Sequence, residues 1–152
     1  MKKIELSLLI ISLVGLILVI AGLEAAWYVV IPFLLLLGIF YYFFGFALLN
    51  NIAPEGIFRS VSYKGISPLR IFGSVLAGMA ISLVPVAVLF KLRQYPMGGT
   101  ITLLAGISTL LVLIFMIILY IRQKKKIHLE NIIRFGIAFL IILAFMKLEI
   151  SV

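Results

Sequence analysis

Long apolar stretches separated by short polar segments make up almost the whole chain. Their approximate limits are residues 4–23, 27–49, 71–90, 100–121 and 132–148. A helix that crosses a bilayer needs about 20 apolar residues, and the first four stretches have that length. The fifth has about 17 residues, so it either just crosses the bilayer or lies in the interface. The pattern predicts an all-α integral membrane protein whose five transmembrane helices form a single domain over residues 1–152.

The first two stretches are nearly continuous, because Glu24 is the only charged residue between Leu6 and Leu49. One straight helix over these residues would be about 66 Å long, about twice the thickness of the hydrocarbon core. The chain must therefore reverse between the two stretches. We predict the turn at Gly22 and Glu24, because glycine can end a helix and an acidic residue is favourable where the next helix begins.

Lysine and arginine fall mainly on one side of the predicted bundle. Ten lie with the N-terminus and three lie opposite, the three being Lys91, Arg93 and Lys147. Because positive residues concentrate in cytoplasmic loops, the N-terminus is predicted inside and the C-terminus outside. A cleaved signal peptide ending near Ala21 is the alternative for the first stretch, although its apolar run is longer than usual.

Composition removes several classes of protein. Hydrophobic residues make up 65% of the chain, charged residues 12%, and cysteine is absent. These values exclude a soluble globular domain, a disordered chain and a disulfide-rich module. The formal net charge of +8 does not indicate nucleic acid, because no polar surface is left to display it. We expect the densest basic cluster to contact lipid headgroups; its members are Arg122, Lys124, Lys125 and Lys126.

Groups that carry chemistry are scarce. The chain has no aspartate and a single histidine, His128, so neither a Mg²⁺ motif nor a zinc site is predicted, and no cofactor or catalytic residue either. Glu130 has Lys126 and Arg134 four residues away on either side, which is the spacing of surface ion pairs on a helix. No acidic residue is expected at mid-depth, and this argues against ion coupling. The acids closest to the apolar stretches are all placed near interfaces; they are Glu5, Glu24 and Glu149.

Small residues recur every four positions in the third and fourth stretches. Such faces let helix backbones approach closely in lipid. Either the two helices pack against each other through them, or they form a surface for another subunit. Pro85, inside the third stretch, should kink its helix. The predicted packing residues are Gly73, Ser74, Ala77, Gly78, Ser82, Thr102, Gly106 and Thr109.

Residues 84–116 resemble the transmembrane hairpin of the stator subunit of gliding-motility and type IX secretion motors. The residues that carry the resemblance are Lys91, Pro96, Gly98, Gly106 and Thr109, with one residue inserted at the turn. That family continues with an intramembrane glutamate, where this chain has Leu110. The resemblance therefore implies a similar hairpin in a bacterial inner-membrane protein, without motor activity.

The sequence thus favours a non-enzymatic subunit or scaffold of an inner-membrane complex, surrounded by lipid bilayer and associated with itself or with another membrane protein. The alternative is a small transporter, channel or lipid flippase, with a path along Pro85 and the serine and threonine residues of the third and fourth helices. A membrane enzyme ranks third. A fully packed bundle would exclude both alternatives, whereas a cavity with polar groups would favour them.

Overall fold

The computed structural model describes residues 1–124 and 126–147, and all regular structure in that part is helical. Five long helices make up the fold: α1 (Lys2–Ile20), α2 (Trp27–Leu49), α3 (Pro68–Leu92), α4 (Gly98–Gln123) and α5 (Lys126–Lys147). Short 3₁₀ turns accompany them: η1 (Glu24–Ala26), η2 (Pro54–Gly56) and η3 (Ser60–Tyr63). Each long helix is long and apolar enough to cross a membrane, which confirms the predicted all-α class with five candidate spans.

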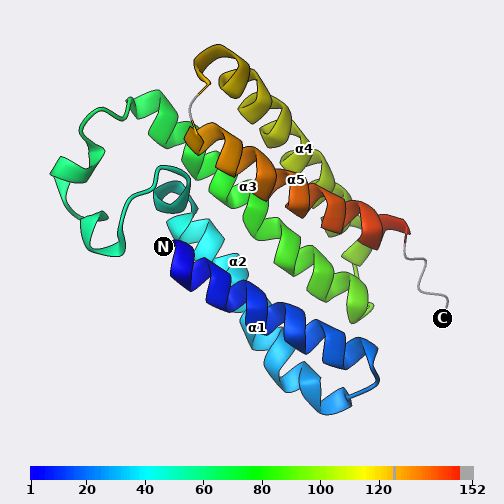
Figure 1. Cartoon of the computed structure of the whole chain (residues 1–152). Helices are drawn as coiled ribbons and strands as arrows, with labels where there is room; N and C mark the ends of the chain where they lie inside the picture. Colours follow the sequence, from blue (N-terminus) through cyan, green and yellow to red (C-terminus); the bar gives the residue numbers. More distant parts are fainter. Residues whose placement is uncertain (125, 148–152) are drawn as a thin grey trace.

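Helix α3 lies at the centre of the bundle. Helices α1 and α2 form an antiparallel hairpin on one side of it, and α4 and α5 form a second hairpin on the other (Figure 1). The first hairpin turns where predicted: Gly22 has a φ of 88° and Glu24 opens η1. The longer connection between α2 and α3 carries η2 and η3.

The start of α5 differs from the sequence prediction. The helix begins at Lys126 rather than near residue 132, so the expected basic loop after α4 is mostly helical. The apolar pattern marks only the part of a helix that suits lipid, whereas backbone hydrogen bonds carry the helix beyond it. Lys124, in the left-handed conformation with φ 48°, ends α4. The predicted positions Lys125, Leu148 and Glu149 lie outside the described residues.

Two helix backbones approach each other closely between α2 and α3, where Gly45 meets Gly78. A Cβ atom on Gly45 would lie 2.6 Å from the Cα atom of Gly78. A Cβ atom on Gly78 would lie 2.9 Å from the carbonyl oxygen of Tyr41. Because the neighbouring atoms are backbone, they cannot rotate away. Both positions therefore require glycine, and they bring the two helix backbones together as small residues do in membranes.

Most of the small residues predicted to pack are inside this bundle. Gly106 faces Ile142 of α5, 3.3 Å from where its Cβ atom would be, whereas Gly73 has open space beside it. The buried members of the set are Ser74, Ala77, Gly78, Ser82, Thr102, Gly106 and Thr109. Thr102 and Thr109 donate their hydroxyl hydrogens to the carbonyls of Gly98 and Ala105 of their own helix. These small faces are therefore used within the chain.

The contrast between Gly78 and Gly73, both on α3, gives a first prediction. Gly78→Ala should lower the free energy of unfolding in detergent by about 1–3 kcal/mol, because the added methyl group meets backbone atoms. Gly73→Ala should leave it unchanged or raise it by up to about 1 kcal/mol, because its methyl group meets nothing and alanine favours helix. Equal effects of the two changes on thermal unfolding would contradict this packing.

The predicted orientation is also testable. Because the chain has no cysteine, any labelling by a thiol reagent comes from the single cysteine that is introduced. Ser60→Cys lies in the connection before α3 and Gly99→Cys in the first turn of α4, and both positions are exposed. An impermeant maleimide added to intact cells should label Gly99→Cys and should reach Ser60→Cys only after the cells are broken, because the basic connections stay inside. The reverse pattern would invert the topology.

Candidate functional site

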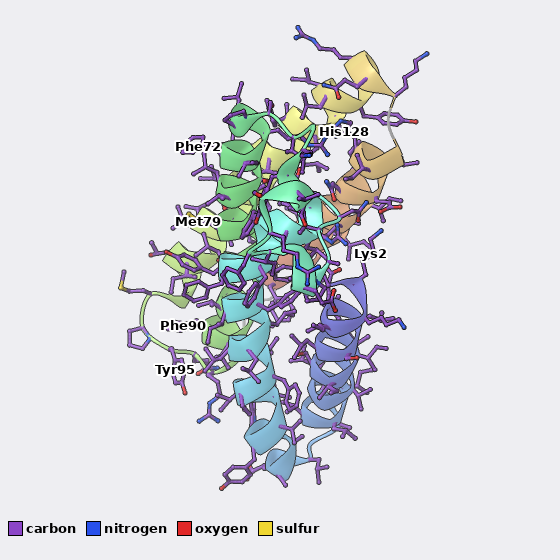
Figure 2. All side chains as sticks on the ribbon, turned by 90° about the vertical axis from the view of Figure 1, so that its left-hand side faces the viewer. Lys2, Phe72, Met79, Phe90, Tyr95 and His128 are labelled. Atoms are coloured by element: carbon purple, nitrogen blue, oxygen red, sulfur yellow. The ribbon has the colours of Figure 1, made fainter. Side chains whose placement is uncertain are left out.

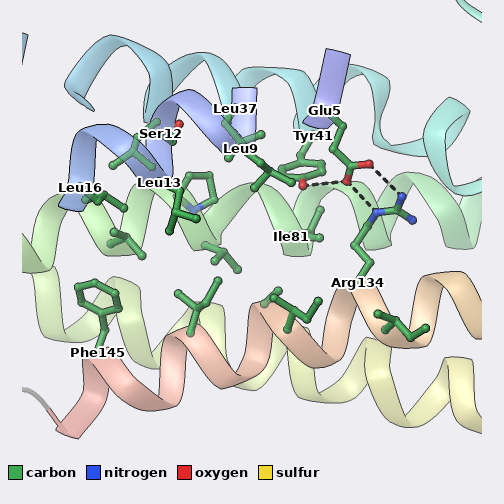
Figure 3. Close-up of a pocket in the computed structure, with 18 of the residues that line it drawn as sticks. Glu5, Leu9, Ser12, Leu13, Leu16, Leu37, Tyr41, Ile81, Arg134 and Phe145 are labelled. Atoms are coloured by element: carbon green, nitrogen blue, oxygen red, sulfur yellow. Dashed lines mark hydrogen bonds and ion pairs between the residues drawn. The ribbon is translucent and has the colours of Figure 1, made fainter. Parts of the chain in front are cut away.

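A cavity of about 420 Å³ lies between α1, α2, α3 and α5 (Figure 3). Its floor is made of α2 and α3 side chains that are all buried: Leu34, Leu37, Ile81, Val84, Pro85 and Val88. Its two walls are α1 and α5. The helix α3 continues through Pro85, whose ring lines the floor, and the kink at this residue remains a prediction.

The cavity opens on the flank of the bundle, between α1 and α5. The lining side chains at its rim are more than a third exposed: Leu9 and Leu13 from α1, and Ile133, Ile137 and Ile141 from α5. Figure 3 shows α1 and α5 as the two borders of this space, with α2 and α3 behind it. A molecule in the cavity would therefore have the apolar outer surface of the helices on both sides of it.

The arrangement follows from how α1 packs. Ser12 and Gly15 are small, buried residues of α1, and a Cβ atom on Gly15 would lie 2.6 Å from Val30 Cγ2 of α2. This short face holds α1 against α2. Helix α5 instead directs Phe135 and Ile142 into the core that it shares with α3 and α4. The two helices are thus held by different neighbours, and the space between them is left open.

A buried ion pair closes one end of the cavity. The guanidinium of Arg134 donates two hydrogen bonds to the carboxylate of Glu5, from Nε to Oε1 at 2.7 Å and from Nη2 to Oε2 at 2.9 Å. The Glu5 side chain is 8% exposed and that of Arg134 is 16% exposed. Paired, parallel hydrogen bonds of this kind between two charged groups are among the strongest in proteins.

Neighbouring polar groups complete the network around the pair. The Tyr41 hydroxyl donates to Glu5 Oε1 at 2.9 Å, and Arg134 Nη1 donates to Asn131 Oδ1 at 2.9 Å. Asn131 Nδ2 in turn donates to the carbonyl of Leu49 at 3.2 Å. A buried charged pair is stable only when its remaining donors and acceptors are also bonded. The network meets this condition and joins α1, α2 and α5.

Helical spacing predicted that Glu130 pairs with Arg134, and the structure does not form this pair. Glu130 pairs with Lys2, with Oε2 to Nζ at 2.6 Å, and Arg134 pairs with Glu5 instead of Glu130. The side chain of Lys126 lies outside the part of the chain that the structure describes, so its pair with Glu130 stays a prediction. Both observed pairs join the first helix to the last, more than a hundred residues apart in sequence.

Glu5, which was predicted near an interface, has its side chain enclosed by protein. Arg134 is eight residues after the start of α5, which is about 12 Å along the helix. In Figure 2 Lys2, at the start of α1, lies nearer the middle of the bundle than His128, in the first turn of α5. Because α1 begins so far along α5, its first turn faces protein. Glu24, by contrast, is exposed.

The remaining predicted residues lie away from this cavity. Arg122 and Lys124 are exposed at the end of α4, as lipid-headgroup contacts would be. His128 is buried, with Nε2 3.1 Å from Oε1 of Gln123. Among residues 1–124 and 126–147, no three histidine or acidic side chains come together as a metal site would need.

No protein-family model, curated protein or solved structure matches this chain. The resemblance of residues 84–116 to a motor stator hairpin therefore stays an expectation. In the structure these residues form the end of α3, the turn and most of α4. The cavity takes three residues from them, all from α3: Val84, Pro85 and Val88.

Breaking the buried pair should be much more costly than breaking the exposed one. Glu5→Met leaves the Arg134 charge buried without a partner and should destabilise the protein by about 3–5 kcal/mol. Adding Arg134→Met removes that charge, so the double variant should recover stability to within about 1–3 kcal/mol of the original, the remainder reflecting the unpaired Tyr41 hydroxyl. Unfolding in detergent measures both.

Lys2→Ala is the matched control, because it breaks a pair that is more exposed: the Lys2 side chain is 53% exposed and that of Glu130 is 34% exposed. Its cost should stay below about 1 kcal/mol. Additive effects of Glu5→Met and Arg134→Met, without recovery in the double variant, would show that the two residues do not act as a pair.

Proposed function

We propose that the chain is a non-enzymatic, multi-pass protein of a bacterial inner membrane that takes a lipid-like molecule into the cavity between α1 and α5, and acts as a small carrier or flippase. The observation that carries this proposal is the cavity itself, apolar along its length and polar at one end. Its volume of about 420 Å³ lies within the range of small-molecule sites, about 300–1,000 Å³.

The direction of the opening supports a ligand that comes from the bilayer. If the five helices span the membrane, the rim formed by Leu13 and Ile137 faces acyl chains rather than water. A lipid-like molecule could enter sideways and replace one apolar contact with another. A water-soluble solute would have to cross the hydrocarbon core first, and this is costly for polar groups.

Polar atoms along the cavity suit an amphiphile. Ser12 is 3% exposed, it lines the cavity, and its Oγ atom has no hydrogen-bond partner among the described residues. A buried hydroxyl without a partner is costly, and an ester or hydroxyl oxygen of a ligand would satisfy it. The Glu5–Arg134 pair lies at the end of the same space (Figure 3). A polar headgroup toward that end and an acyl chain along α3 would match both.

The scaffold hypothesis has less support. Its basis is the small-residue faces of α3 and α4, which were candidates for binding another subunit. Seven of the eight predicted residues are buried within the chain, and only Gly73 has open space beside it. Association with itself or with another membrane protein would therefore have to use other surfaces.

The proposal is tested by partly filling the cavity from its rim. Ile137 lines the cavity and is 56% exposed, so Ile137→Trp adds bulk there without disturbing the core. In proteoliposomes with a headgroup-labelled phospholipid, the unaltered protein should speed exchange between leaflets over empty vesicles. The variant should reduce that rate about ten-fold. Overfilling a site costs about 1–2 kcal/mol, and about 1.4 kcal/mol corresponds to a ten-fold change in rate.

Leu140→Trp is the control, since Leu140 lies on the same helix, is 65% exposed and does not line the cavity. It should leave the rate unchanged. The carrier assignment is wrong if the unaltered protein does not accelerate exchange, or if both tryptophan variants lower the rate equally. If another protein copurifies in a one-to-one ratio and one of its helices fills the cavity, the hypothesis that the chain is a subunit of a membrane complex would be favoured instead.

A further inference from the structure

A second cavity, of about 220 Å³, lies at the end of the bundle where α2 and α4 end and α3 and α5 begin. It shares no lining residue with the cavity between α1 and α5. Its polar lining comes from all four helix ends: Asn50, Ser67, Arg70, Ser74, Gln123, His128 and Asn131. The rest of its wall is apolar and includes Leu69, Phe115 and Leu119. Figure 2 shows His128 at this end of the molecule, opposite Tyr95.

Arg70 gives this cavity a positive charge that is not paired with any carboxylate of the described residues. Its side chain lines the cavity and is half-buried, and within the described residues no carboxylate forms an ion pair with it. Arg70 also stands in the first turn of α3, where the helix dipole is positive and a cation is unfavourable. The unbalanced charge at a partly enclosed site therefore favours an anion from outside the chain.

Asn50 supplies the second, independent observation. It is 9% exposed, and its Nδ2 atom donates to the carbonyl of Phe46 at 2.8 Å and to Ser74 Oγ at 2.7 Å. Its Oδ1 atom is buried and accepts no hydrogen bond from the described residues. A buried acceptor without a donor is costly, so this atom favours a ligand with a hydroxyl or amine hydrogen.

The apolar part of the wall indicates what else the ligand carries. Leu69 is 80% exposed and Phe115 is 53% exposed, and both line the cavity. The cavity is thus polar within the helix ends and apolar where it reaches the flank. Basic pockets between helices at the cytoplasmic side of a membrane are typical sites for anionic lipid headgroups.

From these observations we propose that the end cavity binds the headgroup of an anionic, hydroxyl-bearing glycerophospholipid. Its phosphate accepts hydrogen bonds from the Arg70 guanidinium, and a headgroup hydroxyl donates to Asn50 Oδ1. Its acyl chains leave along Leu69 and Phe115. This site is separate from the proposed carrier cavity, so the proposal for it does not depend on the carrier proposal.

The test compares two lipids and one charge. The full chain, purified in mild detergent, is titrated with dioleoylphosphatidylglycerol or dioleoylphosphatidylcholine and bound lipid is counted by native mass spectrometry. The protein should bind the glycerol lipid at least about ten-fold more tightly, because only that lipid has a net negative charge and hydroxyl donors. Arg70→Gln should weaken binding of the glycerol lipid by about ten-fold or more, whereas Arg70→Lys should keep most of it.

Arg59→Gln is the control for charge alone, because Arg59 is exposed in the connection before α3 and does not line the cavity. It should leave the affinity within about two-fold, a change below 0.5 kcal/mol. Asn50→Leu should reduce the preference for the glycerol lipid over dioleoylphosphatidic acid, which lacks the headgroup hydroxyls. Thermal unfolding of each variant confirms that it is folded.

Three results would overturn the proposal. The first is equal affinity for the two lipids. The second is an equal loss of affinity in Arg70→Gln and Arg59→Gln, which would assign the effect to general surface charge. The third is saturation of the site by inorganic phosphate without lipid, which would assign it to a soluble anion. The Ile137→Trp variant should retain the lipid preference, so a failed carrier assay does not decide this question.

Discussion

The pairing of Glu5 with Arg134 is the constraint on which the arrangement of this bundle depends. Helix α1 otherwise packs mainly on α2, and α5 packs on α3 and α4. The pair joins α1 directly to α5 at one end and leaves the cavity between these two helices beyond it (Figure 3). Inside a bilayer an unpaired charge costs several kcal/mol, so separating α1 from α5 at this point is strongly opposed. An ion pair that closes one end can thus coexist with an open flank.

The helical architecture was predictable because apolar length alone decides it. Five stretches long enough to cross a bilayer gave five helices, and the reversal at Gly22 followed from the excess length of the first two. Helix ends were less predictable. Helix α5 begins six residues before the predicted apolar stretch, since most residues from Lys126 to Asn131 are polar and hydropathy cannot tell a polar helical turn from a loop.

The candidate site was not predicted, and the reason is the separation of its parts. Glu5 and Arg134 are 129 residues apart, whereas spacing rules relate residues three or four apart on one helix. These rules assigned Arg134 to Glu130 and missed the pair. One signal was available: both residues lie within predicted helices, both were assigned to the same side of the bundle, and their charges are opposite. Charged residues in such positions usually pair with one another.

Asn131 connects the two cavities, because it contacts a residue of the first and lines the second. Its Oδ1 atom accepts from Arg134 at the cavity between α1 and α5, while its own side chain lines the cavity at the helix ends. Its Nδ2 atom is bonded to the carbonyl of Leu49, which fixes its orientation. Because Asn131 is 4% exposed, water cannot replace these partners. The first turns of α5 thus separate an apolar space with a neutralised charge from a polar space with an unbalanced one, and this difference in charge is the physical reason to expect different ligands in them.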